Sequence, residues 1–515
     1  MRPTFLGFET QKRTLQVAQK NLDITGNNLS NTNTVGYTRQ RVDLYAMYVS
    51  GNRSLRWCSQ TNNLSVSGQG VNAYGVSQIR DMYIDKRYRE NVAIEAETEK
   101  TVAILSEVED VLDNFETDGL LHFTEQFFKA LQDYSVEKPD GSEVATFACN
   151  TAVNLCRLLN DYDNKLCEVE DTYVAEMEDT VFYLNTRLDD MNILNDRIAR
   201  ELLTYPEGYG PNELYDQLNM YIDELSNYGD VSITENRNGT FDVTLCGIKV
   251  VDGNEFKVNH LIMEDYESYN QAIIYYESGE EMNCQNGVIK SFYNMLNGNG
   301  VYATGSQNGE YGIAYFKSAV NEFASTLARV FNSCNGGYED PSRMMFEPTV
   351  EGATITAGNI HVSDAWLQNP TMIGEVRSLD PITGMYQYGF DSVTNEDGTV
   401  TLQNTNVIYL LSQFENTNIK FGNAHDFQGS FYQYISFVSN RLAQTITYDK
   451  SRYDGAVTTV DTLLDARDEV SGVDMDEEGI NMLNYQKWYS ASSRMLTALD
   501  DCLDKLINST GRVGL

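Results

Sequence analysis

The sequence predicts a multidomain α+β protein whose terminal helices pair as a coiled coil, with a long-helix bundle domain between them and β-rich domains inserted into that bundle. Three observations predict this class. Apolar residues recur at heptad spacing at both chain ends, and one helical pattern runs unbroken from residue 143 to about residue 203. Segments of alternating apolar and polar residues with Asn-Gly or Asp-Gly turns interrupt the helices in the second half.

The first helix is expected over residues 4–30. One seven-residue frame places a set of its apolar side chains on a single stripe: Phe8, Leu15, Ala18, Leu22 and Leu29. Residues 27–33 are dense in Asn, Ser and Thr, whose side chains hydrogen-bond to the backbone and so end a helix. A loop or short strands are expected from there to about residue 85.

The bundle is expected from four further helices, over residues 87–112, 120–134, 143–203 and 213–227. Turn sequences separate them, at Lys138-Pro-Asp-Gly-Ser and at Tyr205-Pro-Glu-Gly-Tyr-Gly-Pro. A helix as long as the third is typical of a rod-like bundle.

β-structure is expected next. Residues 231–245 alternate around Arg237-Asn-Gly, which predicts a hairpin, and strand-like segments continue to about residue 313. A helix over 314–332 separates them from a second β-rich stretch with a hairpin at Asn395-Glu-Asp-Gly. Long helices over 431–464 and 479–508 complete the chain.

The last helix carries its own heptad stripe: Met482, Tyr485, Tyr489, Leu496, Leu499, Leu503 and Leu506. Either terminal stripe could simply pack on its own domain, as most apolar stripes do. Charge favours pairing of the two ends, because residues 1–56 hold eight basic and three acidic side chains, whereas residues 465–515 hold five basic and ten acidic ones.

These elements divide the chain into four expected parts. Residues 1–35 with 475–515 form a terminal coiled-coil domain, and residues 36–228 with 314–335 and 424–474 form a helical bundle domain. Residues 229–313 form an inserted β-rich domain, and residues 336–423 form a second β-rich segment.

Composition excludes several functional classes. The chain has 515 residues and a formal net charge of −38, without a basic patch interleaved with aromatics, so nucleic acid is not an expected partner. No stretch reaches the roughly 18 apolar residues that a membrane span needs, and the N-terminus lacks the apolar core of a secretory signal. The protein is therefore expected to be cytoplasmic, or exported by a machine that does not read such a signal.

Signatures of enzymatic or metal chemistry are also missing. Of the eight cysteines, Cys149, Cys156 and Cys167 lie in one helical pattern and are expected to be buried small apolar residues. No zinc-type spacing, catalytic motif or phosphate loop occurs, and the four histidines are scattered. Asp474-Met-Asp-Glu-Glu-Gly opens like a calcium loop, but Tyr485 stands where the bidentate Glu belongs. No catalytic, cofactor or metal site is expected, although paired carboxylates of a glycan hydrolase in a β-rich insertion remain an alternative.

Two terminal blocks resemble a known family. Ile24-Thr-Gly-Asn-Asn-Leu-Ser-Asn-Thr-Asn-Thr-Val-Gly-Tyr-Thr-Arg-Gln is similar to the N-terminal signature of the bacterial flagellar axial proteins, and Val470-Ser-Gly-Val-Asp-Met-Asp-Glu-Glu resembles its hook-associated members. Tyr485-Gln-Lys-Trp-Tyr-Ser-Ala-Ser is similar to their C-terminal block. The residues that carry the motif are Asn27, Asn28, Asn31, Gly36, Tyr37, Arg39, Gln40, Ser471, Gly472, Val473, Asp476, Glu477 and Glu478.

The motif also has a physical interpretation. Gly36 permits a positive φ before Tyr37, and the Asn-rich loop provides a polar hinge after the first helix. Asp474 is placed to cap the last helix, with Glu477 at the third helical position.

The resemblance implies a structural adaptor at the junction of hook and filament, exported by the flagellar type III apparatus and located outside the cell. It implies four partners: the hook protein, a second hook-filament junction protein, further copies of the chain, and a cytoplasmic export chaperone on the C-terminal helix. The expected assembly interface comprises Leu15, Ala18, Leu22, Leu29, Tyr485, Tyr489, Leu496, Leu499, Leu503 and Leu506. Another axial protein, such as the hook protein, is the alternative within this family.

Overall fold

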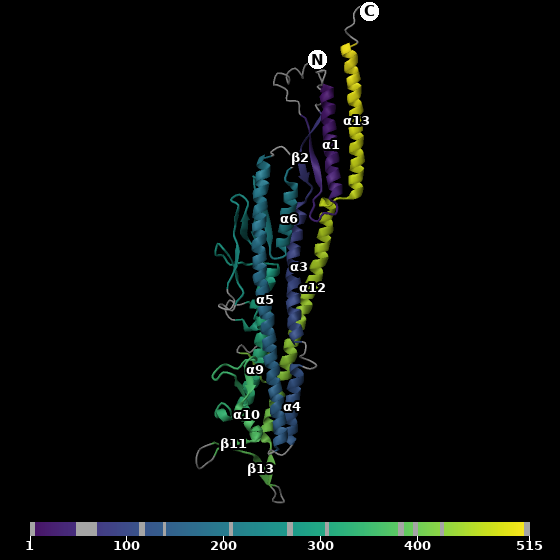
Figure 1. Ribbon diagram of the computed structural model, residues 1–515. Coiled ribbons are helices and arrows are strands. Elements are labelled where there is room, and N and C mark those ends of the chain that lie inside the picture. The colour runs from purple at the N-terminus through teal and green to yellow at the C-terminus, as the bar shows by residue number, and fades with distance from the viewer. Residues whose placement is uncertain are drawn as a thin grey trace, which may run out of the picture.

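A computed structural model describes ten ranges of the chain: residues 6–47, 70–112, 119–136, 141–204, 210–264, 271–303, 308–379, 386–394, 400–422 and 427–508. The molecule is a long rod (Figure 1). A pair of terminal helices extends beyond one end of a helical bundle, and small β-sheets lie along the bundle and at its opposite end. The predicted α+β class, with paired terminal helices and inserted sheets, is confirmed.

The terminal helices are α1 (Leu6–Ser30) and α13 (Met475–Asn508), which pack along each other. An antiparallel hairpin of β1 (Gln40–Ala46) and β2 (Val71–Gln78) packs on α1. Its register runs from Gln40 opposite Gln78 to Ala46 opposite Val71. The stretch after α1, expected to be loop or short strands, is therefore partly an ordered two-stranded sheet.

The bundle is built on three long helices, α3 (Met82–Leu112), α5 (Ser142–Thr204) and α12 (Phe431–Ser471). Shorter helices complete it: α4 (Leu120–Val136), α6 (Asn212–Ser226) and α9 (Ile313–Cys334). α5 has 63 residues, and its buried positions recur every three or four residues from Ala145 to Ile198, so one face of the helix lies against its neighbours along its length. The predicted turns around Lys138 and Tyr205 fall on residues 137–140 and 205–209, outside the described ranges.

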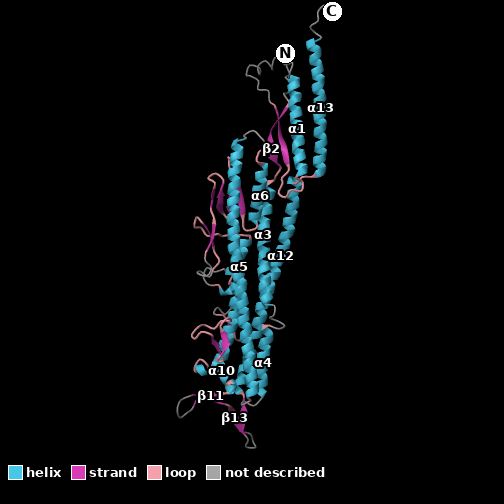
Figure 2. Ribbon diagram, in the orientation of Figure 1, coloured by secondary structure: helices cyan, strands magenta, loops and turns pink. Residues whose placement is uncertain are grey.

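The first β-rich insertion packs on α5 (Figure 2). Its main sheet has the strand order β3 (Val231–Glu235), β4 (Phe241–Leu245), β5 (Ile248–Asp252) and β6 (Lys257–Val258). The predicted hairpin around Arg237-Asn-Gly is present as β3 and β4, with Gly239 at φ +79° in the turn. A second small sheet pairs β7 (Leu261–Met263) with β8 (Ile274–Tyr276).

The expectation of strands up to residue 313 was wrong in one place. Residues 288–297 form helix α8 (Val288–Asn297), whose Ile289, Phe292, Met295 and Leu296 are buried. These positions follow helical spacing, but a ten-residue apolar run is too short to distinguish helix from strand by pattern alone.

The segment 336–423 is less β-rich than expected. Its strands form two-stranded sheets: β9 (Phe346–Pro348) with β10 (Ile360–Val362), β11 (Val376–Leu379) with β12 (Tyr386–Gly389), and β13 (Asp391–Thr394) with β14 (Val400–Gln403). Helices α10 (Asp364–Gln368) and α11 (Thr405–Phe414) were not expected. A fourth pair, β15 (Lys420–Phe421) with β16 (Phe427–Gln428), precedes α12. The turn at Asn395 lies outside the described residues, but the strands flanking it do pair.

The cysteines behave in two ways. Cys149 and Cys156 are buried in α5 as expected, and Cys167 is half-buried. Cys246 and Cys284 form a disulfide, which the sequence did not predict, between the β4–β5 turn and the segment before α8.

Candidate assembly interface at the joined chain ends

The two terminal helices run antiparallel. Near the bundle, Asn28 of α1 reaches Glu478 of α13, with Asn28 Nδ2 3.3 Å from Glu478 Oε2. At the other end, Gly7 lies against Leu499. Therefore α1 ends and α13 begins next to the bundle. The first residues of α1 and the last residues of α13 lie at the far tip of the rod (Figure 1).

The predicted C-terminal stripe lies on the face of α13 that meets α1. Glu478 and Ser492, the two buried residues of this helix, fall on the same heptad frame as the stripe, and Leu499 contacts α1 directly. Burial along the stripe is partial: Tyr485, Leu496, Leu499 and Leu503 are half-buried, whereas Tyr489 is 39% and Leu506 56% exposed. A single partner helix thus covers this stripe incompletely.

The predicted N-terminal stripe lies beside the buried face of α1, not at its centre. The buried positions are Val17, Ala18, Asn21, Ile24, Thr25 and Asn28. Of the predicted residues only Ala18 belongs to this set, with 1% exposure, whereas Leu15, Leu22 and Leu29 are half-buried. The buried arc is wide and partly polar because α1 packs on α13 and on the β1–β2 hairpin at once.

Asn28 is the centre of the joint between the terminal pair and the bundle. Its Oδ1 accepts hydrogen bonds from the Tyr37 hydroxyl at 2.8 Å and from the Gln40 backbone N–H at 3.0 Å. Its Nδ2 donates to the Gln40 carbonyl at 2.9 Å as well as to Glu478. One buried side chain therefore ties α1, the start of β1 and the start of α13 together. Asn31 supports it by donating to Asn27 Oδ1 at 2.9 Å.

Gly36 is required by its backbone and by its surroundings. Its φ is +78°, in the region that favours glycine. A Cβ at this position would lie 2.4 Å from Met220 Sδ of α6. This glycine therefore lets the loop after α1 pass directly over the bundle.

Arg39 connects the N-terminal block to the C-terminal one. Its Nε lies 2.9 Å from Glu478 Oε1, and its Nη1 lies 2.9 Å from Glu477 Oε2. Its backbone N–H donates to the Ser471 carbonyl at 2.9 Å. Burial lowers the pKa of Arg39, but hydrogen bonds and charge from Glu477 and Glu478 outweigh it and raise that pKa above its usual value. The guanidinium therefore stays charged between two carboxylates from the other end of the chain.

The remaining C-terminal motif residues shape the turn between α12 and α13. The Gly472 N–H donates to the Asp468 carbonyl at 2.8 Å, and Val473 is half-buried. Asp474 Oδ1 accepts from the backbone N–H groups of Asp476 at 2.7 Å and Glu477 at 3.2 Å, which confirms it as the N-cap of α13. The Asp476 side chain is exposed, so only the backbone of this residue serves the cap.

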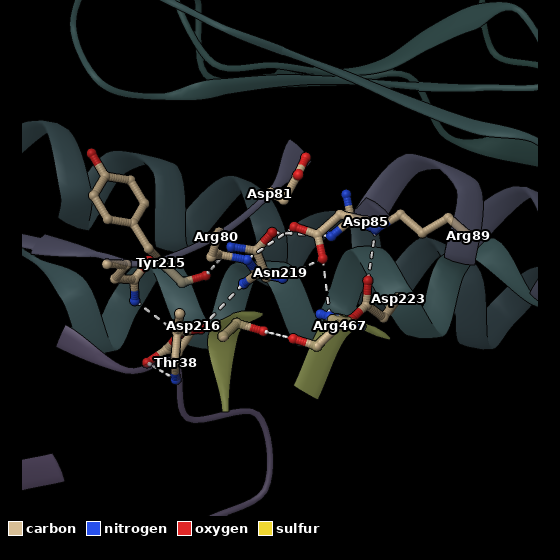
Figure 3. Close-up of polar contacts among 12 residues, drawn as sticks. Thr38, Arg80, Asp81, Asp85, Arg89, Tyr215, Asp216, Asn219, Asp223 and Arg467 are labelled. Carbon is tan, nitrogen blue, oxygen red and sulfur yellow. Dashed lines mark hydrogen bonds and ion pairs between the residues drawn. The ribbon is translucent and has the colours of Figure 1, made fainter. Parts of the chain in front are cut away.

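Beneath the joint lies an ion network that sequence reasoning missed (Figure 3). Asp85 Oδ2 is 3.0 Å from Arg80 Nε, and its other oxygen is 3.0 Å from Arg467 Nε. Asp223 forms ion pairs with Arg467, whose Nη2 is 2.7 Å from the carboxylate, and with Arg89, whose Nε is 2.6 Å from it. The network joins α3, α6 and the end of α12, and its charges alternate, so each ion has an opposite neighbour. Arg80, which follows β2, begins this network, and no motif in the sequence analysis marked it.

A buried carboxylate lies beside the network. Asp216 of α6 is 6% exposed and accepts a hydrogen bond from Gln78 Nε2 at 2.8 Å. Burial raises the pKa of Asp216 to about 6, although hydrogen bonds from Thr38 and the charge of Arg80 oppose the shift. Strand β2 and the loop after α1 are thus held to α6 by hydrogen bonds to a carboxyl group whose pKa is about 6.

Within the described ranges, no group of three or more His, Cys, Asp and Glu is placed to hold a metal ion. His122 lies on α4, His260 in the loop between β6 and β7, and His361 on β10, whereas His425 lies outside those ranges. Across the same part of the chain, no helix combines the length and apolarity that a membrane crossing requires.

Comparisons with known proteins fit this geometry. The family model "Flagellar hook-associated protein FlgK helical domain" matches residues 105–339. "Flagella basal body rod protein" matches residues 8–38, and "Flagellar basal body rod FlgEFG protein C-terminal" matches residues 456–509. The two rod-protein models thus cover the two helices that pair here, together with much of the joint.

Full-length relatives carry one description. The chain is 27% identical to flagellar hook-associated protein 1 of Bacillus subtilis, over 99% of both chains. It is 22% identical to the protein of that description from Escherichia coli, covering 96% of this chain and 98% of the relative. The solved structure of the flagellar hook junction protein FlgK from Burkholderia pseudomallei shares the fold, with a TM-score of 0.55 and 12% identity over 75% of this chain and 100% of that one. The chain is therefore a full-length homologue of flagellar hook-associated protein 1, a structural protein of the extracellular flagellum.

Proposed function

We propose that this protein is the junction adaptor between hook and filament, exported by the flagellar type III apparatus. One observation carries the proposal: the chain ends form an antiparallel helix pair that extends beyond the bundle and keeps apolar surface exposed. Tyr489 and Leu506 on the α1-facing stripe are 39% and 56% exposed, and α13 exposes further apolar side chains on other faces. Surface of this kind on a rod is typical of a subunit that is covered by neighbours after assembly.

The expected interface residues divide by what they touch. Ala18 is buried within one chain, and Leu499 packs on α1 of its own chain. Leu15, Leu22 and Leu29 keep part of their surface exposed. We propose that these leucines, with the exposed parts of Tyr485, Tyr489, Leu496, Leu503 and Leu506, contribute to contacts between subunits.

We propose as partners the hook protein, a second hook-filament junction protein and further copies of this chain. A cytoplasmic export chaperone would bind the C-terminal helix through Leu496, Leu499, Leu503 and Leu506. Because this stripe faces α1 in the folded chain, chaperone binding would require α13 to be released from α1 before export.

We also propose a domain division that follows the sequence analysis. A terminal domain of residues 1–35 with 475–515 would be joined at the Asn28–Arg39–Glu478 contacts to a bundle of residues 36–228, 314–335 and 424–474. Residues 229–313 and 336–423 would be insertions that each pack on the bundle.

The function is tested by placing charge on the terminal pair. Leu499→Asp with Leu503→Asp introduces two carboxylates into a half-buried apolar seam, at a cost of several kcal/mol if assembly buries them fully. We expect the bundle to stay folded. In cells, electron microscopy should show hooks without filaments, and analysis of the culture supernatant should show flagellin released into the medium.

The matched control is Ser490→Asp with Thr497→Asp, which adds the same charge to exposed positions of α13 outside the seam. This control should assemble normally. Normal filaments in cells carrying only the Leu499→Asp, Leu503→Asp chain would refute the adaptor function, and loss of the hook itself would favour a hook-type subunit.

A further inference from the structure

A cavity of about 410 Å³ lies between α3, α8 and α12, apart from the joint that connects the terminal pair to the bundle. Its volume falls within the range of about 300–1,000 Å³ that is typical of small-molecule pockets. The ionisable residues that line it include three acids and three bases: Glu97, Glu310, Asp449, Lys290, Arg441 and Arg452. Walls with both signs of charge are complementary to a ligand that itself carries both signs.

Glu97 forms the acidic end of the cavity together with Asp449. Glu97 is 7% exposed, and its Oε2 has no hydrogen-bond partner among the described residues. Arg452 lies 3.9 Å from the other oxygen of Glu97 and 3.3 Å from Asp449, so one cation is shared between two buried carboxylates. Lys290 acts on Glu97 through its charge but donates no hydrogen bond to Oε2. An ammonium that enters the cavity would supply the donor that this buried acceptor lacks.

Arg441 of α12 forms the basic end of the cavity. Its guanidinium carbon lies 4.7 Å from the centre of the Tyr311 ring and 5.4 Å from that of the Phe437 ring, so two aromatic side chains hold it in place. Within the described ranges Arg441 forms no ion pair. A guanidinium that contacts rings through its faces keeps the N–H groups at its edge available, and these can donate to a carboxylate as a bidentate pair.

The two ends are separated by the reach of a dipeptide. Asp449 and Arg441 lie on the same helix, and the positions from 441 to 449 span about 12 Å along its axis. An extended dipeptide spans about 7 Å. A hydrogen bond of about 2.8 Å at each end extends its reach to about 13 Å. A single amino acid spans only about 3.5 Å, so it would reach one end of the cavity and not the other.

Asn294 of α8 lies between the two ends. It is one helical turn from Lys290, whose charge acts on Glu97. Its backbone adjoins Gly312, the neighbour of Tyr311, because a Cβ on this glycine would lie 2.7 Å from the Asn294 carbonyl oxygen. The Asn294 side chain lines the cavity, and within the described ranges its Nδ2 has no acceptor. This amide is therefore placed to donate to the carbonyl of a peptide bond.

We propose that this cavity binds a short peptide with free ends. The peptide ammonium lies between Glu97 and Asp449, and the terminal carboxylate pairs with Arg441. The peptide bond between them meets Asn294. The site is complete within one chain and does not depend on the proposed adaptor function.

Titration calorimetry of the full chain with glycylglycine, the smallest peptide that carries both charges, tests the site. At about pH 7 the peptide amine is mostly protonated, and Glu97, whose pKa burial raises to about 6, is mostly ionised. We expect saturable binding of one peptide per chain. N-acetyl-glycylglycine lacks the ammonium and glycylglycinamide lacks the carboxylate. Each should bind at least about tenfold more weakly, because each loses a charged hydrogen bond, and free glycine should bind as weakly.

Two variants assign each peptide charge to its residue. Glu97→Gln should weaken glycylglycine binding about tenfold and leave N-acetyl-glycylglycine unchanged, because that ligand has no ammonium to lose. Arg441→Gln should weaken glycylglycine binding about tenfold and leave glycylglycinamide unchanged. Lys450→Gln is the control, because Lys450 is exposed on α12 and lies outside the cavity. It should bind glycylglycine as the parent chain does, and circular dichroism verifies that all three variants are folded.

The parent chain alone can overturn the proposal. No saturable binding of glycylglycine up to about 10 mM would do so, as would equal affinity for either capped peptide. Equal affinity for glycine would contradict the spacing of the two ends. Unchanged glycylglycine binding in a folded Glu97→Gln or Arg441→Gln chain would show that the peptide binds elsewhere. Because every measurement uses the isolated chain, each of these results leaves the adaptor function as it stands.

Discussion

At the residue scale, Glu97 shows how a buried carboxylate sets a pH response. It lies on the face of α3 that packs on α12, is 7% exposed, and its Oε2 has no hydrogen-bond partner among the described residues. Arg452 is its nearest cation, at 3.9 Å. Burial raises the pKa of Glu97 from 4.5 to about 6, against the opposing charges of Arg452 and Lys290. The ionised form is therefore unfavourable in the folded protein.

We expect Glu97→Gln to stabilise the protein above pH 7 by about 1–2 kcal/mol, because it removes this penalty. A pKa that is higher in the folded than in the unfolded chain means that the folded state binds the proton more tightly. The stabilisation that protonated Glu97 gives to the folded state is complete below about pH 4.5 and is lost as pH rises through about 6. Denaturant unfolding of both chains from pH 4.5 to 8 should show a difference that grows with pH. An equal effect of the exposed Asp110→Asn, or a constant difference, would contradict the assignment.

Arg39 is the residue on which the joint depends most. Its partner Glu478 has a side chain that is 3% exposed, so removing the guanidinium leaves a buried carboxylate without its cation. We expect Arg39→Ala to destabilise the terminal pair by about 2–4 kcal/mol. Arg39→Lys should restore only part of the lost stability of the terminal pair, because one ammonium lacks the planar fork that reaches both Glu477 and Glu478.

Hydrogen exchange of the α1 and α13 amides measures this effect separately from the bundle. Arg41→Ala is the control, because the Arg41 side chain is 66% exposed and lies 3.6 Å from Asp43, a contact worth about 0–1 kcal/mol. Equal exchange in the two variants would show that the ion pairs do not hold the joint.

At the element scale, the long helices could be predicted and the details of their packing could not. α5 was predictable because its apolar residues keep helical spacing from Ala145 to Ile198. The buried face of α1 was not, because Asn21, Thr25 and Asn28 are buried beside Val17 and Ile24, and polar side chains give no signal in an apolar pattern. Asn28 is buried because it bonds to Tyr37, Gln40 and Glu478, and the last of these is distant in sequence.

The ion network escaped prediction for a related reason. The network residues come from three helices that lie far apart in the chain, with Asp85 and Arg89 on α3, Asp223 on α6 and Arg467 on α12. Charged residues on amphipathic helices are usually solvated. Only the arrangement of α3, α6 and α12 brings them together, burying Asp85 and Arg89 and half-burying Asp223 and Arg467. By contrast, the motif residues at the joint could be named from sequence because they form two compact blocks, although their contacts could not.

The Cys246–Cys284 disulfide acts on one element, the first β insertion. It closes a loop with a sequence separation of 38 residues, and Gly229 lies so close that an added Cβ would be 2.6 Å from Cys246 Sγ. By restricting the unfolded chain, a disulfide of this loop length contributes about 2–4 kcal/mol. We expect Cys246→Ser with Cys284→Ser to lose this amount.

Hydrogen exchange of β3 to β8 would show whether the loss is local to the insertion. A reducing agent should reproduce the effect in the parent chain and change nothing in the double variant. Equal protection of the insertion in both chains would show that packing on α5 alone stabilises it.

At the scale of the whole molecule, stability is distributed unevenly along the rod. The bundle buries a continuous core, whereas α13 has only Glu478 and Ser492 buried and exposes Ile480, Leu483 and Trp488. Local opening should therefore cost least at the free tip of the terminal pair and most in the bundle. This gradient suits a subunit whose ends gain their full set of contacts only from neighbours.

Limited proteolysis of the isolated, monomeric chain should reveal the gradient. We expect early cleavage within α1 and α13 from their free ends, and a resistant core that begins near α3 and ends near the C-terminus of α12. Arg39→Ala should accelerate trimming of both ends without affecting the core, because it opens the joint and leaves the bundle intact. Mass spectrometry of the fragments identifies the cut sites. Full protection of both ends at low protein concentration would mean that one chain already satisfies its terminal helices, and that their exposed apolar stripes do not need a neighbour.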